Sequence, residues 1–133
     1  MTSHGGTLFV IYNADGGVLN AVRDSFWKTF APRSYPCALC ALAFGFFVAR
    51  REWRAFLSRV PQQIVELHRD DYRQRLPYLD ADLPVILLQD AEDVGGEESA
   101  IRLIVTAEEM GAMDDVTELV ALARRRLSLS ALE

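Results

Sequence analysis

The chain has 133 residues, half of them apolar and a quarter charged, with a formal net charge of −5. That length suits one domain with its own hydrophobic core, and two cysteines are too few for a disulfide scaffold. The acidic balance argues against a nucleic-acid partner, because phosphate contacts need dense positive charge. The longest apolar run, residues 35–49, is about 15 residues and falls short of the ~20 that span a bilayer. With no cleavable signal segment at the start, we expect a cytoplasmic protein that does not enter a membrane.

The charge is distributed unevenly along the chain. Residues 1–60 carry seven Lys or Arg against three acidic residues, whereas residues 61–133 carry seven Arg against sixteen acidic residues. Several arginines of the first part lie close together: Arg50, Arg51, Arg54 and Arg59. We interpret them as the solvated side of a helix, and a local anion-binding face is the alternative.

The first part of the chain predicts a flexible tail, a strand and a helix. Residues 1–6 are polar and Gly-rich, typical of a flexible N-terminus. Thr7–Tyr12 is continuously apolar, which predicts a strand buried on both faces. The turn Asn13–Gly17 follows, at the place where open α/β sheets build ligand sites, but no glycine-rich phosphate motif accompanies it. Val18–Phe30 carries apolar residues every four positions and predicts an amphipathic helix.

The middle of the chain predicts two helices, or one broken helix, between Cys37 and Val60. Gly45 is the expected break, and Pro61 ends the second apolar pattern. Gln63–His68 alternates as a strand does, and a cluster of polar residues follows it at 68–71. His68 is interpreted as a strand-end histidine bonded to a neighbouring carboxylate, with a general base or metal ligand as the alternative.

The last part predicts a hairpin and a helix. Leu83–Leu88 is an apolar strand with Pro84 near its start, a position where proline is tolerated. A polar connection at 72–83 precedes this strand and has room for a short helix. We expect the strand to pair antiparallel with Ile101–Thr106 across an acidic loop. Asp114 is the expected cap of the final amphipathic helix.

The two cysteines, Cys37 and Cys40, carry the most specific chemistry of the chain. With Ser34 as N-cap, Cys37 is expected at the third helical position, where helix-end N–H groups favour a thiolate. Cys40 follows one turn later on the same face, within reach of a disulfide. The spacing therefore suits thiol–disulfide exchange, half of a metal site, or two buried structural cysteines.

The order of elements, with a CxxC at a helix start and a proline-led strand further on, resembles the thioredoxin-like fold. The resemblance implies that Cys37 is the exposed attacking thiol, that Cys40 is the resolving thiol, and that Pro84 is a cis-proline facing the pair. It spans roughly residues 7–127. In thioredoxins a strand leads directly into the CxxC, whereas residues 14–36 separate Asn13 from Cys37 here.

We therefore expect an α/β protein with one thioredoxin-like domain over residues 7–129, in which a small mixed sheet of about four strands has helices on both faces. The expected function is that of a cytoplasmic thiol–disulfide oxidoreductase or redox sensor, with a protein thiol or disulfide as partner and no cofactor. The first alternative is a binding or regulatory domain with structural cysteines. The second is a metal protein, for which a closed zinc site would need four ligands and the histidines are His4 and His68. The third is a nucleophilic enzyme using Cys37 and His68.

Overall fold

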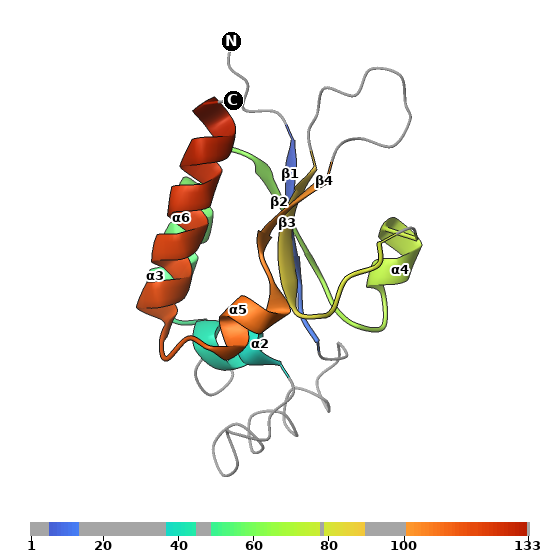
Figure 1. Ribbon diagram of the computed structural model, residues 1–133, viewed down its shortest axis with the longest axis horizontal. Coiled ribbons are helices and arrows are strands. Elements are labelled where there is room, and N and C mark those ends of the chain that lie inside the picture. The colour runs from blue at the N-terminus through green and yellow to red at the C-terminus, as the bar shows by residue number, and fades with distance from the viewer. Residues whose placement is uncertain (1–5, 14–36, 45–48, 78, 90–100, 133) are drawn as a thin grey trace.

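The computed structural model describes residues 6–13, 37–44, 49–77, 79–89 and 101–132, with residues 128–132 described as helical backbone only. Within these residues a four-stranded mixed sheet runs through the centre of the molecule in the order β2-β1-β3-β4 (Figure 1). β1 pairs parallel with β2 and antiparallel with β3, and β4 pairs antiparallel with β3. The strands are β1 (Thr7–Ile11), β2 (Gln63–Leu67), β3 (Val85–Gln89) and β4 (Ile101–Val105).

β1 is a central strand because its side chains are apolar in both directions. Leu8 and Val10 belong to the core on one face of the sheet, and Phe9 and Ile11 belong to the core on the other. None of the four is more than 1% exposed. A strand without a polar face must be covered on both sides, so the prediction of a doubly buried strand is confirmed.

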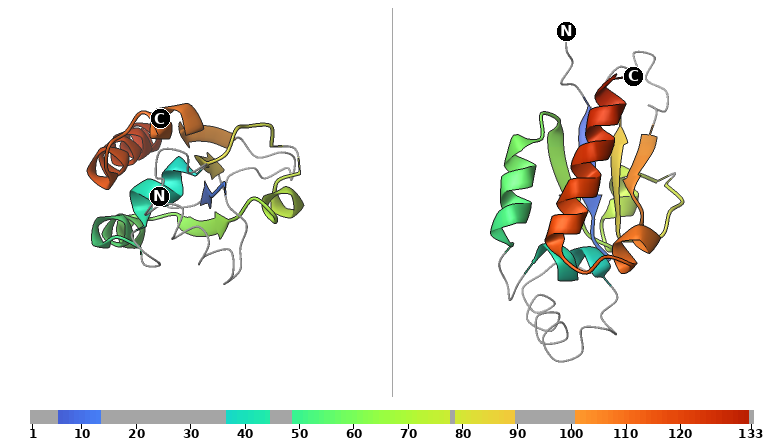
Figure 2. Two further views of the ribbon diagram at one scale, coloured as in Figure 1. Left: turned by 90° about the horizontal axis from the view of Figure 1, so that it is seen from below. Right: turned by 60° about the vertical axis from the view of Figure 1, so that its left-hand side comes forward.

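The first face of the sheet is covered by two long helices that lie side by side, α3 (Arg51–Arg59) and α6 (Val116–Leu132) (Figures 1 and 2). Their apolar sides meet over the sheet, where Trp53 and Leu119 are fully buried and Phe56 is 2% exposed. Two short helices close the end of this core, α2 (Ala38–Ala43) and α5 (Ala107–Gly111). None of the helices described is both long and apolar enough to cross a membrane.

The second face carries a smaller core under the short helix α4 (Tyr72–Arg75). Tyr72 and Leu76 are buried against Phe9 and Leu87. The prediction of a mixed sheet with helices on both faces is confirmed, as is the short helix expected within residues 72–83. On β4, Leu103 pairs with Leu87 but is 51% exposed, so this face is covered unevenly.

α5 has no counterpart among the predicted elements, although its start carries a capping box. The Thr106 hydroxyl accepts the N–H of Glu109 at 3.2 Å, and the Glu109 carboxylate accepts the N–H of Thr106 at 3.0 Å. The same carboxylate forms a two-pronged ion pair with Arg126 of α6, with both N–O distances at 2.8 Å. Hydrogen bonds from Arg126 and Thr106 lower the pKa of Glu109 to about 2. This ion pair ties α5 to α6.

Two further predictions about helices have clear outcomes. The two helices expected between Cys37 and Val60 are α2 and α3, which confirms that prediction. The expected cap Asp114 is wrong: α6 begins at Val116, and the Asp115 carboxylate accepts the N–H of Glu118 at 3.1 Å. The tail at 1–5, the predicted helix at 18–30, Gly45 and the acidic loop at 90–99 lie outside the described residues.

Candidate functional site

Cys37 is the N-cap of α2. Its backbone is extended, and its Sγ accepts the N–H of Cys40 at 3.1 Å. The prediction that Cys37 occupies the third helical position is therefore wrong, because the helix begins one residue after it and the sulfur itself takes the capping role. Ser34, the cap expected from the sequence, lies outside the described residues.

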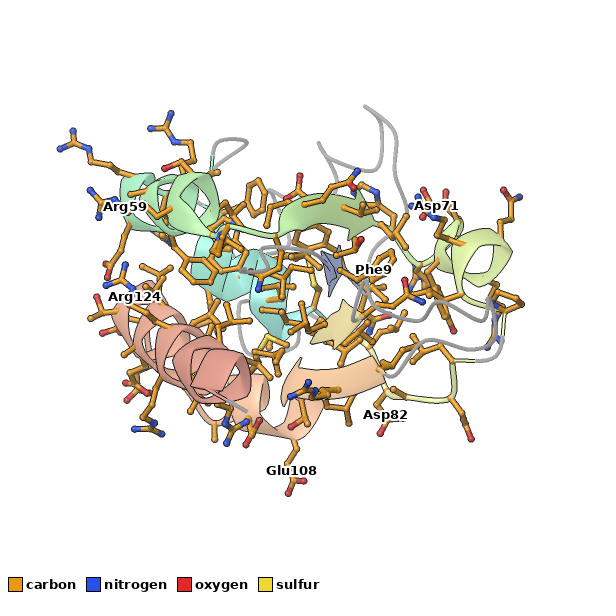
Figure 3. The ribbon with its side chains drawn as sticks, turned by 90° about the horizontal axis from the view of Figure 1, so that it is seen from above. Phe9, Arg59, Asp71, Asp82, Glu108 and Arg124 are labelled. Atoms are coloured by element: carbon orange, nitrogen blue, oxygen red, sulfur yellow. A yellow bond between two sulfur atoms is a disulfide. The ribbon has the colours of Figure 1, made fainter. Side chains whose placement is uncertain are left out.

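The two cysteines are joined by a disulfide, drawn as the yellow bond in Figure 3. Their Cα atoms are 5.3 Å apart, which is an ordinary separation for a disulfide. The prediction that the CxxC spacing brings the sulfurs within bonding reach is confirmed. Whether the cysteine pair serves thiol–disulfide exchange, structure or metal binding is a separate question.

The Cys37 sulfur receives a second N–H donor from the end of β1. The chain follows β2 as far as Tyr12, whose N–H donates to the Leu67 carbonyl at 2.9 Å. The next N–H, that of Asn13, donates to Cys37 Sγ at 3.3 Å. One sulfur thus accepts two main-chain donors, one from its own helix and one from Asn13, which lies 24 residues before Cys37 in the sequence. This contact joins β1 to the start of α2, across a part of the chain that the structure leaves undescribed.

Both cysteines are buried. Cys37 has no exposed surface and Cys40 is 8% exposed, and both belong to the core between the sheet and α6. The exposure of Cys37 implied by the resemblance to thioredoxins is therefore wrong for the disulfide form. Burial follows from the position of α2, which packs against α5 and α6 at the end of the larger core.

Pro84 lies at the same end of the sheet as the disulfide. The Leu83–Pro84 peptide bond is cis, as the resemblance implied. Ile11 pairs with Val85, so continuing the antiparallel register places Tyr12 opposite Pro84 and Asn13 opposite Leu83. Asn13 and Leu83 also line one common hollow. The fold therefore brings Leu83, the residue before Pro84, to the same hollow as Asn13, whose N–H contacts Cys37, and that Pro84 faces the pair stays a prediction.

That hollow is open and has a volume of about 880 Å³. One of its lining residues is Asn13, whose N–H contacts the Cys37 sulfur, and the hollow extends from there between α4 and α5. Its rim carries charges of both signs, and Figure 3 labels the two acidic residues. The lining residues are Asn13, Arg69, Tyr72, Arg73, Ala81, Asp82, Leu83, Ala107 and Glu108.

Tyr12, at the end of β1, contacts both β2 and α2. Its side chain is 4% exposed, and its hydroxyl donates to Glu66 Oε2 at 2.7 Å. Burial, followed by the negative charge of Glu66 and its hydrogen bond, raises the pKa of Tyr12 well above its ordinary value. The nearby indole N–H of Trp53 lowers that pKa in part, but it completes no hydrogen bond of good geometry.

From the sequence, Tyr12 was expected only as the last residue of a buried strand. Tyr12 lies beside β2 because of a parallel pairing between positions more than 50 residues apart. No local sequence pattern predicts which positions pair in this way. The ring also contacts Phe44 at the end of α2, with the two ring centres 5.8 Å apart. Tyr12 therefore contacts both β2 and the end of α2, the helix that begins at the disulfide.

The polar cluster after β2 is a turn. Asp71 Oδ1 accepts the backbone N–H of His68 at 2.7 Å, and the His68 ring lies against Tyr12 with the ring centres 5.5 Å apart. The neighbouring carboxylate expected for His68 is therefore present, bound to its main chain. No hydrogen bond joins His68 to Cys37 within the described residues, so they do not show the pairing that a Cys–His nucleophile needs.

Within the part of the chain that the structure describes, no group of three or more His, Cys, Asp or Glu side chains could hold a metal ion. His4 lies outside that part. No family model, curated protein or solved structure matches this chain. What its site can do must therefore be read from its own residues.

Proposed function

We propose that the protein carries out thiol–disulfide exchange through Cys37 and Cys40. The observation that carries the proposal is a disulfide at the start of a helix whose Cys37 sulfur already accepts two main-chain N–H groups. Those donors are aimed at the atom on which negative charge appears when the pair is reduced. The proposed partner is a protein or peptide disulfide, and a reducing compartment such as the cytoplasm would regenerate the dithiol.

The exchange conserves atoms and electrons. The Cys37 thiolate attacks one sulfur of the partner disulfide, forming a mixed disulfide and releasing the other partner sulfur as a thiolate, which takes a proton. Cys40 then loses its proton and attacks Cys37, forming the internal disulfide and releasing the second partner thiol. The partner gains two electrons and the pair loses two. A thiol reductant reverses the change in the pair.

Two opposing effects act on the reduced Cys37. Burial raises the pKa of a thiol, because the charged form loses solvation. Hydrogen bonds to the charged form lower it, and a carboxylate that accepts two or three main-chain N–H groups can have a pKa below about 2. We expect the donors from Asn13 and Cys40 to prevail, giving Cys37 a pKa below the ordinary value of about 8.5.

Other features support a thioredoxin-like architecture. A four-stranded mixed sheet, the pair at the start of α2 and the cis bond before Pro84 are features that were expected from the resemblance. The 880 Å³ hollow beside Asn13 and Leu83 offers a partner chain a place next to the pair. Opening of the contacts over Cys37 would precede attack, since that residue is fully buried in the disulfide form.

The test is turnover of a peptide disulfide with a thiol reductant as electron source. The wild-type protein should accelerate reduction, and Cys37→Ser should abolish it while the protein stays folded by circular dichroism. Cys40→Ser should instead accumulate a mixed disulfide on Cys37, visible as an added mass. Equal activity in wild type and Cys37→Ser would refute the proposal.

The burial of both cysteines favours a second candidate, a structural disulfide. Its weakness is the small loop, because cross-linking residues three apart removes little chain entropy, about 2 kcal/mol against ~3 for a 15-residue loop. The two candidates separate on reduction. A structural role predicts loss of the fold or of much stability when the disulfide is reduced, and no turnover in the exchange assay.

A further inference from the structure

A second hollow lies at the opposite end of β1 from the disulfide. It has a volume of about 240 Å³ and sits between the C-terminal end of α3, the start of β2 and the facing side of α6. Gln63 pairs with Thr7 at the start of β1, whereas Asn13 reaches Cys37 beyond its end, so the two sites do not overlap. The lining residues are Phe56, Arg59, Val60, Pro61, Gln62, Arg124 and Leu127.

Two arginines line this hollow from different helices. Arg59 ends α3 and Arg124 lies on α6, and Figure 3 labels them on the two facing sides. Within the described residues no acidic side chain pairs with either, whereas Arg126, two positions along α6, pairs with Glu109. Two like charges that line one small hollow repel each other, and an anion between them removes that repulsion. Of the four arginines of the anion-binding face weighed from the sequence, only Arg59 lines this hollow, and the second cation is Arg124 of α6.

The other lining groups are apolar, with one exception. Phe56 is 2% exposed, and Val60 and Leu127 are partly buried against the larger core. They would cover the apolar part of a ligand. The exception is Gln62, whose Oε1 is buried and accepts no hydrogen bond. That oxygen has almost no accessible surface, so a ligand seated in the hollow does not reach it, and recognition rests on the two arginines and the apolar side chains.

We propose that this hollow binds a small organic carboxylate that also has an apolar side chain, as an N-acylated apolar amino acid has. The carboxylate accepts hydrogen bonds from Arg59 and Arg124, because a guanidinium matches a carboxylate in both charge and shape. The side chain packs on the apolar lining at Val60 and Leu127. The volume of about 240 Å³ suits a ligand of this size.

The test uses N-acetyl-L-leucine and two relatives that each lack one feature. N-acetyl-L-leucinamide lacks the charge, and N-acetylglycine lacks the apolar side chain. Titration of the full-length, ¹⁵N-labelled protein with each compound, followed by NMR, reports both affinity and location. N-acetyl-L-leucine should shift signals of α3, α6 and Gln62 in a saturable way, and each relative should bind about tenfold more weakly or worse.

Single variants with matched controls on the same helices test the residues. Arg59→Gln and Arg124→Gln should each weaken binding of N-acetyl-L-leucine about tenfold, whereas Arg54→Gln and Arg125→Gln should leave it unchanged. All four side chains are exposed, so these changes should leave the fold intact. Absence of saturable shifts would overturn the proposal, as would equal binding of the acid and the amide. If the control variants weakened binding as much, the contact would be general attraction to positive charge and the proposal would also fail.

Discussion

The Cys37 sulfur depends on a main-chain donor that comes from outside its own helix. The N–H of Asn13 is that donor, at 3.3 Å, and its position follows from the end of β1. Main-chain donors have an experimental advantage, because proline removes the N–H while a matched substitution by alanine keeps it. The contribution of this one contact to the thiolate can therefore be measured.

We expect Asn13→Pro to raise the pKa of Cys37 by about one unit relative to Asn13→Ala, because a hydrogen bond to a charged group contributes about 1.5–3 kcal/mol. The measurement is the pH dependence of thiolate absorbance in a Cys40→Ser background, which leaves one thiol to titrate. Circular dichroism checks that both variants fold. Equal Cys37 pKa values in the two variants would show that the Asn13 donor does not stabilise the thiolate.

Tyr12 should make the protein sensitive to alkaline pH. The pKa of Tyr12 is raised in the folded state, whereas in the unfolded chain it is expected at its ordinary value of 10.0. Above pH 10 the unfolded state therefore releases a proton that the folded state keeps. The stabilisation is complete below pH 10 and is lost as the pH rises further. In urea unfolding, Tyr12→Phe should cost about 1 kcal/mol at neutral pH and should lose less stability than wild type above pH 10.

If Tyr12→Phe followed the wild-type stability curve above pH 10, the assignment of the alkaline loss of stability to Tyr12 would be wrong.

At the scale of elements, Glu109 is the group that holds α5 to α6. Its pKa is lowered to about 2 from 4.5, so its stabilisation is complete above pH 4.5 and is lost as the pH falls toward 2. Glu109→Gln keeps an acceptor for the capping box and removes the charge. It should cost about 1 kcal/mol at pH 7 and progressively less toward pH 2 in urea unfolding. A cost for Glu109→Gln that stayed constant between pH 7 and pH 2 would contradict this assignment.

The pair of strands β3 and β4 allows a test of uneven burial. Leu87 and Leu103 are cross-strand partners, yet Leu87 is fully buried and Leu103 is 51% exposed. We expect Leu87→Ala to cost about 2–5 kcal/mol in unfolding free energy, since it leaves a cavity under α4. Leu103→Ala should cost less than about 1 kcal/mol. Similar losses would mean that another surface covers Leu103 in solution.

Most elements could be predicted because their signals are local. Apolar runs gave the strands at 7–12 and 83–88, and a 3.6-residue period gave the helices that became α3 and α6. α5 was missed although Thr106 and Glu109 have the spacing of a capping box, so a closer search for helix starts would have found it. Asp114 and Asp115 give the same sequence signal for a helix cap, and only the course of the backbone decides which of the two caps.

At the scale of the whole molecule, the site depends on contacts that local patterns cannot show. The hydrogen bond from Asn13 to Cys37, and the register that puts Pro84 opposite Tyr12, both follow from how β1 pairs with its neighbours. The burial of Cys37 also arises at this scale, because it depends on α2 being packed under α5 and α6. The resemblance to thioredoxins implied that Cys37 is exposed, whereas tertiary packing buries it in the disulfide form.

The hollow between α3 and α6 also depends on contacts between distant parts of the chain. Arg59 and Arg124 are separated by most of the second half of the chain, and only the packing of the two helices brings them to one cavity. The sequence showed a cluster of arginines on α3 but gave no reason to connect Arg59 with α6. The two ends of β1 thus present separate candidate sites, one built on sulfur and one on guanidinium groups.

The most direct test of the exchange chemistry is the rate of thiol alkylation in the reduced, metal-free, folded protein as a function of pH, with mass spectrometry to assign the labelled cysteine. The account predicts that Cys37 reacts before Cys40 and with an apparent pKa below the ordinary value of about 8.5. If neither cysteine reacts until the protein unfolds, the disulfide belongs to the core alone and the proposed exchange is contradicted.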